Sequence, residues 1–180
     1  MTKTALVTGA ASGMGRMAAQ RLAAAGYRVA AVDLNEAGLA ETAQHSPNMS
    51  TYTCDVADPA AVGAVVEKVR AELGPIEHLV HAAALCRVGS ALTHDVAEMR
   101  RVMEVNYLGT INLCQAVIPA MKAAGSGTVV LFASVAGWVP SPALGAYAAS
   151  KFAVVAYTDV LAQELAGSGI RFLSICPPHV

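Results

Sequence analysis

Tyr147 and Lys151 lie one helical turn apart in a helix-forming stretch of the sequence. Side chains at positions i and i+4 share one face of a helix. A free tyrosine has a pKa of about 10, which is too high for base catalysis near neutrality, and a nearby ammonium group lowers that value. The pair is therefore a candidate proton-transfer site. On its own, the same spacing is more typical of a solvated helix face.

Two further polar residues occupy positions where chemistry is possible. Ser134 ends an apolar run that predicts a strand, so its hydroxyl is expected at the carboxyl edge of a sheet, where open α/β sheets bind ligands. Asn106 lies inside a helical pattern although asparagine is a mediocre helix former. Taken separately, Ser134 can be an ordinary strand-end hydroxyl. Asn106 is either an incidental polar residue or one that holds a water.

A glycine-rich loop follows the first apolar run, with the sequence Thr8-Gly9-Ala10-Ala11-Ser12-Gly13-Met14-Gly15. A strand–glycine–helix junction directs backbone N–H groups at a pyrophosphate, and glycines permit close approach. Asp33 ends the next apolar run, where a carboxylate can accept hydrogen bonds from an adenosine ribose; the alternative is a strand-end turn residue. Its charge would repel a 2′-phosphate, and neither Ser12 nor Leu34 is basic. These features favour NAD(H) over NADP(H).

Short apolar runs alternate with helix-period segments along the whole chain. The predicted strands are Thr4–Thr8, Arg28–Asp33, Ser50–Cys54, His78–Ala82, Gly127–Ser134 and Arg171–Cys176. The predicted helices are Gly13–Ala25, Glu36–Ala43, Pro59–Leu73, Val96–Ala124 with a break near Glu104, and Ala146–Ala166. This alternation predicts one α/β domain over residues 1–180, with a parallel sheet and right-handed crossovers.

The composition narrows the possible functions. The 180 residues are 55% hydrophobic and 14% charged, with 12 Lys+Arg against 13 Asp+Glu. This balance argues against a nucleic-acid-binding surface and against disorder. Glycines and prolines interrupt the uncharged segment 123–150, so no membrane span is expected. The four widely spaced cysteines are expected to be reduced, mostly buried thiols of a cytoplasmic protein, with no metal bound.

The glycine pattern T-G-x-x-x-G-x-G, followed by Asn106, Ser134, Tyr147 and Lys151 in that order, resembles the short-chain dehydrogenase/reductase family over nearly the whole chain. The resemblance implies a doubly wound Rossmann sheet of about six strands in the order 3-2-1-4-5-6. It implies that Tyr147 exchanges a proton with the substrate oxygen, which Ser134 hydrogen-bonds. Lys151 would lower the tyrosine pKa and hold the nicotinamide ribose, and Asn106 would anchor a water that relays protons.

The resemblance also implies a cofactor site and an assembly. Asp55-Val56 falls where the family holds adenine, although a helix-capping Asp beside a core Val is the alternative. A homodimer or homotetramer is expected, through the helices near Glu104–Ala124 and Ala146–Ala166. The implied cofactor-binding residues are Gly9, Ser12, Gly13, Met14, Gly15, Asp33, Leu34, Asp55, Val56, Ala82, Ala83, Tyr147, Lys151 and Pro177.

Two segments depart from the family pattern. His81-Ala82-Ala83-Ala84 replaces the usual Asn-Asn-Ala-Gly, so cofactor binding is expected to be looser and His81 to be buried and hydrogen-bonded. Pro178 replaces the glycine of a usual Pro-Gly pair after the last strand. Family members normally continue beyond this point through a substrate loop and a further strand. We therefore expect these residues to belong to a longer active polypeptide.

Two functions from different classes fit these observations. The first is an NAD-dependent oxidoreductase acting on a secondary alcohol or ketone. The second is a non-catalytic NAD(H)-binding module that serves as a sensor or partner subunit. The stretches Leu85–Gly89 and Trp138–Leu144 are the expected lining of a substrate pocket, in which Trp138 is either a wall or a loop anchor.

Overall fold

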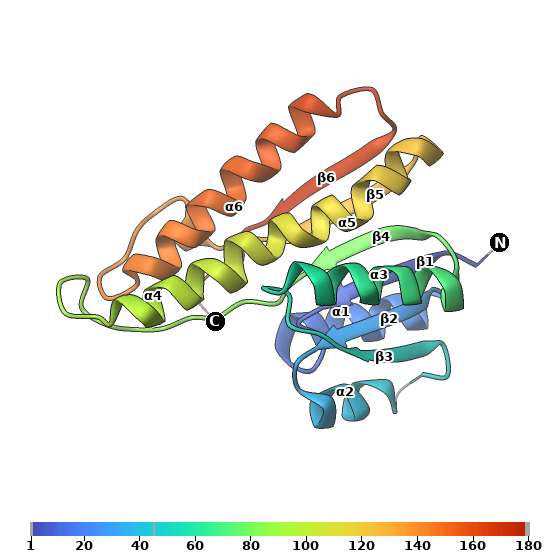
Figure 1. Ribbon diagram of the computed structural model, residues 1–180, viewed down its shortest axis with the longest axis horizontal. Coiled ribbons are helices and arrows are strands. Elements are labelled where there is room, and N and C mark those ends of the chain that lie inside the picture. The colour runs from blue at the N-terminus through green and yellow to red at the C-terminus, as the bar shows by residue number, and fades with distance from the viewer. Residues whose placement is uncertain (1, 45, 179–180) are drawn as a thin grey trace.

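Six parallel strands form one sheet in the computed structural model, which describes residues 2–44 and 46–178. The strand order is β3-β2-β1-β4-β5-β6, which confirms the predicted doubly wound topology. In Figure 1, β3 lies near one end of the molecule and β6 near the other. The strands are β1 (Thr4–Thr8), β2 (Arg28–Asp33), β3 (Met49–Thr53), β4 (Ile76–His81), β5 (Gly127–Phe132) and β6 (Ile170–Ile175).

Helices cover the sheet in two layers. Side chains of α3, α5 and α6 join one buried cluster with the sheet, and side chains of α1 and α2 join a second. The central strand β1 contributes Leu6 to the first cluster and Val7 to the second, as expected for a strand buried on both faces. The helices are α1 (Gly13–Ala24), α2 (Glu36–Ala43), α3 (Pro59–Leu73), α4 (Val96–Met103), α5 (Gly109–Ala124) and α6 (Gly145–Glu164).

Local sequence explains where several helices begin and end. The Asp58 side chain accepts hydrogen bonds from the N–H groups of Ala60, at 2.8 Å, and Ala61, at 3.2 Å, and Pro59 occupies the first helical position. Gly26 follows α1 with a φ of 87°, which glycine adopts without strain. These signals correspond to the predicted helix boundaries.

Several predicted boundaries were wrong. β4 ends at His81, so Ala82 lies in the loop that follows, and β5 ends at Phe132 rather than Ser134. After Phe132 the chain turns into a short 3-10 helix, Val135–Gly137, and the Ser134 hydroxyl caps it by accepting from Ala136 N–H at 3.1 Å. The predicted break near Glu104 is a π-helical turn over Glu104–Leu108. Such turns insert one extra residue into a helix and are frequent at functional sites.

The cysteines are only partly buried. All four are free; Cys86 is exposed and Cys176 is half-buried, while Cys54 and Cys114 are buried. Within residues 2–44 and 46–178, no helix is long and apolar enough to cross a membrane. The described part of the chain also contains no group of three or more His, Cys, Asp or Glu side chains arranged to hold a metal. His179 and Val180, at the end of the sequence, lie outside the described residues.

Candidate active site

The glycine loop connects β1 to α1, and at two of its glycines another segment of backbone lies very close. Gly9 has a φ of 68°, and a Cβ atom there would lie 2.7 Å from the Ala83 nitrogen. A Cβ atom on Gly15 would collide with the carbonyl oxygen of Gly9. Both positions therefore exclude larger residues, and the loop leaves space above it for a ligand.

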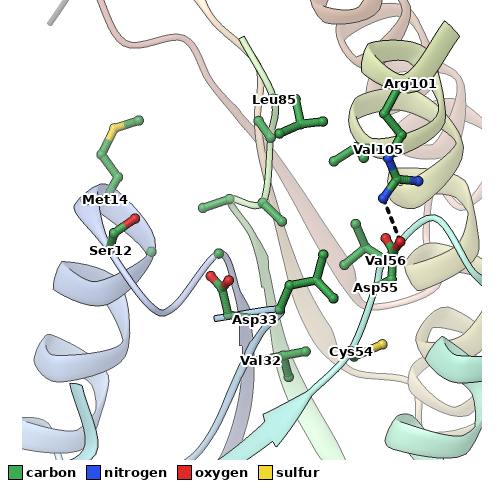
Figure 2. A pocket seen from close by; sticks show the side chains of 17 residues that line it. Ser12, Met14, Val32, Asp33, Cys54, Asp55, Val56, Leu85, Arg101 and Val105 are labelled. Atoms are coloured by element: carbon green, nitrogen blue, oxygen red, sulfur yellow. Dashed lines mark hydrogen bonds and ion pairs between the residues drawn. The ribbon is translucent and has the colours of Figure 1, made fainter. Parts of the chain in front are cut away.

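A cavity of about 320 Å³ opens above this loop at the carboxyl edge of the sheet. Figure 2 shows Ser12 and Met14 on one side of it and Asp55 with Arg101 on the other. The predicted cofactor residues that line it are Gly9, Ser12, Gly13, Met14, Gly15, Asp33, Leu34, Asp55, Val56, Ala82 and Ala83. The remaining three predicted cofactor residues, Tyr147, Lys151 and Pro177, are outside this lining. Ala84 and Leu85 also line it, as do four residues that sequence reasoning missed: Val32, Cys54, Arg101 and Val105.

Asp33 lies at the base of the cavity, where two backbone groups fix its carboxylate. One oxygen accepts from Ala11 N–H at 3.0 Å and the other from Asn35 N–H at 3.0 Å. Leu34 is 58% exposed beside it. The carboxylate is thereby oriented at the carboxyl end of β2, and carboxylate oxygens retain further lone pairs for a ligand hydroxyl.

Asp55 forms an ion pair at another wall of the cavity. Its Oδ2 lies 2.6 Å from Arg101 Nη2, and its Oδ1 accepts from Ala57 N–H at 3.0 Å. Burial alone would raise the pKa of Asp55, but the Ala57 hydrogen bond and the Arg101 guanidinium outweigh it and lower the pKa below its usual value. The carboxylate is therefore ionised at neutral pH.

Tyr147, Ser134 and Lys151 come together where α6 meets the segment that follows β5. The Ser134 side chain lies near enough to the Tyr147 phenol to affect its pKa. Lys151 Nζ lies 5.7 Å from the centre of the Tyr147 ring and donates to the carbonyl of Phe132 at 2.7 Å. Three of the four predicted catalytic residues thus form one cluster.

Burial governs the protonation of this cluster. It raises the pKa of Tyr147, an effect that the Ser134 side chain opposes and nearby Cys86 reinforces. It also lowers the pKa of Lys151 to about 8, although Cys86 and Cys176 oppose this shift. The expected lowering of the tyrosine pKa is therefore not found here. The reason is that desolvation of the half-buried phenol outweighs the stabilisation of its anion.

The Asn106 side chain joins two segments of the site. Its Oδ1 accepts from Leu85 N–H at 2.7 Å, while Nδ2 donates to the Leu85 carbonyl at 2.9 Å and to Ser150 Oγ at 2.9 Å. Ser150 in turn donates to the Tyr147 carbonyl at 2.7 Å. The amide, which is 1% exposed, therefore connects the loop after β4 to α6 through direct protein contacts.

His81, the residue that departs from the family pattern, is buried and hydrogen-bonded as expected. It is 3% exposed, and its Nδ1 lies 2.6 Å from Thr8 Oγ1. Its Nε2 is buried with no hydrogen-bond partner among the described residues. Desolvation, with a smaller contribution from Lys151, lowers the pKa of His81 to about 3. The imidazole is therefore neutral beneath the site.

The two stretches expected to line a substrate pocket lie side by side. Gly89 N–H donates to the Ala143 carbonyl at 2.9 Å, and Gly89 forms a parallel bridge with Leu144. Trp138 is 61% exposed, and its indole N–H lies 3.2 Å from Cys176 Sγ. Pro177 accepts a hydrogen bond from Val135 N–H at 3.0 Å, which holds the end of the described chain against the segment after Ser134.

Comparison with known proteins agrees with this geometry. The profile of the short chain dehydrogenase family matches residues 3–180. The chain therefore belongs to the short-chain dehydrogenase/reductase family of oxidoreductases.

Named relatives match nearly the whole of this chain. D-threitol dehydrogenase of Mycolicibacterium smegmatis is 42% identical over 99% of this chain and 70% of its own length. 2-(R)-Hydroxypropyl-CoM dehydrogenase of Xanthobacter autotrophicus is 39% identical over 98% of this chain and 74% of its own. Among solved structures, levodione reductase superposes with a TM-score of 0.91 at 33% identity, covering 98% of this chain and 71% of the other. An actinorhodin polyketide ketoreductase variant with NADPH gives 0.95 at 33% identity, with 98% and 70% covered.

Proposed function

We propose that the protein transfers a hydride between NAD(H) and a secondary alcohol or ketone, with Tyr147 as the proton donor and acceptor. The observation that carries this proposal is the cluster of Tyr147, Ser134 and Lys151 at the same edge of the sheet as the glycine-loop cavity. A pure binding module has no need of a phenol paired with a serine hydroxyl and a buried lysine.

The cavity fits a dinucleotide. Its glycine loop leaves backbone N–H groups unobstructed at the start of α1, where they suit a pyrophosphate. Bound there, the nicotinamide would supply the hydride acceptor or donor. Gly13, Met14 and Gly15 would hold the phosphates, Asp33 and Leu34 would contact the adenosine ribose, and Asp55 and Val56 would contact the base.

The chain's own residues would handle the proton. A protonated Tyr147 donates to the oxygen of a ketone, or accepts from an alcohol once it has lost its proton, and the Ser134 hydroxyl stabilises charge on that oxygen. Lys151, held by the Phe132 carbonyl, provides the positive charge behind the phenol. Asn106 acts as a positioning residue by fixing Leu85 and the first turns of α6. Pro177 would contact the cofactor, and the loops near Gly89 and Ala143 would border the substrate.

NAD(H) is the proposed cofactor because the Asp33 carboxylate would lie beside the adenosine ribose and repel the 2′-phosphate that NADP(H) carries there. Arg16, a basic residue nearby on α1, is already paired with Glu41 at 2.9 Å. A relative from Sphingomonas that is 36% identical carries NAD(+) in its name, 2-dehydro-3-deoxy-L-rhamnonate dehydrogenase (NAD(+)). The polyketide ketoreductase structure contains NADPH, so members of the family use either NAD(H) or NADP(H). The Asp33 side chain is the feature that favours NAD(H) in this protein.

We further infer a homodimer or homotetramer that forms through α5 and α6. Leu108, Phe152 and Val160 are 46%, 42% and 47% exposed on or beside these helices. A second copy would cover these apolar side chains. The free cysteines support a reducing compartment, the cytoplasm.

Spectrophotometry of nicotinamide reduction tests the function. The purified protein is mixed with NAD and a panel of small secondary alcohols, including D-threitol, and NADH formation is followed at 340 nm. Turnover of at least one alcohol supports the oxidoreductase. NADH binding with neither oxidation of any alcohol nor reduction of any ketone would favour the non-catalytic module instead.

A further inference from the structure

Arg101 reaches from α4 into the wall of the cavity. Besides its contact with Asp55, its Nη1 lies 3.6 Å from Glu104 Oε2 in the following π turn. The side chains of Arg101 and Asp55 are 40% and 31% exposed, so the pair lies at the mouth of the cavity. Figure 2 shows the guanidinium directed at Asp55, beside Val105 and Val56.

The Arg101 ion pair leaves the Asp55 carboxylate oxygens able to accept further hydrogen bonds while fixing the orientation of the carboxylate. A carboxylate offers about four lone-pair sites. Ala57 N–H occupies one on Oδ1 and Arg101 occupies one on Oδ2. Because these two partners hold the Asp55 carboxylate from two sides, the group cannot rotate freely. Val56 and Val105 line the same cavity, and their apolar side chains suit the flat face of a base.

We propose that Arg101 is a positioning residue that makes the site specific for adenine at the base end of the dinucleotide. This inference rests on the proposed function. A fixed carboxylate accepts from the exocyclic amino group of adenine. Hypoxanthine carries a carbonyl oxygen at that ring position, which a carboxylate repels, and its neighbouring N–H would require the carboxylate to turn. Arg101 prevents that turn.

The Arg101–Asp55 ion pair is expected to affect base recognition more than it affects the stability of the fold. Partly exposed ion pairs stabilise a fold only slightly. Replacing Arg101 should therefore change base recognition while leaving the melting temperature nearly unchanged. Arg100, its exposed neighbour on α4, supplies a matched control because it is outside the cavity lining.

The experiment measures dissociation constants by titration for NADH, its hypoxanthine analogue and reduced nicotinamide mononucleotide, which lacks the adenosine half. Wild-type protein should bind NADH at least about tenfold more tightly than the hypoxanthine analogue, the effect of one charge-assisted hydrogen bond. Arg101→Met should reduce that ratio to about twofold, weaken NADH binding and leave mononucleotide binding unchanged. Arg101→Lys should restore part of the ratio, and Arg100→Met should match the wild type.

Three results would overturn the proposal. An unchanged ratio in Arg101→Met would show that Asp55 needs no positioning. Equal weakening of all three ligands together with a lower melting temperature would assign Arg101 a structural role. Wild-type protein that binds none of the three would contradict the proposed function itself, which distinguishes that failure from the other two.

Discussion

Buried ionisable residues lie directly beneath the proposed reaction site, and their protonation follows from desolvation. Lys151 and His81 are each 3% exposed, and burial lowers the pKa of both, to about 8 and about 3 respectively. At neutral pH the lysine is therefore largely charged and the histidine neutral. The site thus holds a single cation behind the Tyr147 phenol, because a second charge on His81 would be both buried and repelled by Lys151.

His81 should make the protein sensitive to acid. Its folded-state pKa is about 3 and its unfolded value about 6.5, so below pH 6.5 the unfolded state binds a proton that the folded state does not. Stability from this group is fully present above pH 6.5 and is lost as pH falls toward 3, by about 2 kcal/mol between pH 7 and pH 5. Urea denaturation of wild type and His81→Asn at both pH values measures this. Parallel losses in the two proteins would contradict the assignment.

Asp33 should determine the choice of cofactor. Asp33→Ala removes the charge that repels a 2′-phosphate, so the wild-type preference for NADH over NADPH should narrow by about tenfold or more. Asp33→Asn keeps an oxygen for Ala11 N–H and serves as the control that separates charge from loop structure. Titration of both cofactors gives the ratio. Tighter binding of NADPH than NADH by the wild type would refute this interpretation.

For helices and strands, the features set by neighbouring residues could be predicted from the sequence, whereas the features set by tertiary contacts could not. Asp58-Pro59 and Gly26 marked helix ends correctly because capping is local. The type of the break at Glu104 was not predictable, because a π turn depends on packing around Asn106. Arg101 was missed because its partner Asp55 lies 46 residues away in sequence, and only the sheet order brings them together.

Two glycine-to-alanine substitutions should have opposite effects. At Gly15, the new Cβ would collide with the Gly9 carbonyl at the β1–α1 junction, so stability should fall by about 1–3 kcal/mol and NADH binding should be lost. At Gly63, in the interior of α3, nothing lies within 4 Å of a new Cβ, so alanine should stabilise the protein by about 0.5–1 kcal/mol. Denaturant titrations check both signs. A neutral Gly15→Ala would show that the junction can relax.

For the whole molecule, the sheet order explains why the two halves of the site meet. β1 lies between β2 and β4, so the chain reverses direction across the sheet at this point, where open α/β sheets bind ligands. On one side, Asp33 ends β2 and Asp55 follows β3. On the other, the segment after β5 contributes Ser134, and α6 contributes Tyr147 and Lys151. The glycine loop stands between these groups. This arrangement would allow a long dinucleotide to extend from Asp55 to the Tyr147 phenol.

The most direct test of the proposed catalytic role of Tyr147 is to remove its hydroxyl oxygen. Tyr147→Phe preserves the ring and deletes the hydroxyl that would exchange the proton. Turnover of the best alcohol substrate should fall by at least about 100-fold, the lower range of general acid–base contributions, while the dissociation constant for NADH stays within a few-fold. Steady-state kinetics and cofactor titration on the same preparation measure both. A variant that keeps most of its kcat would show that Tyr147 is not the acid and base of the reaction.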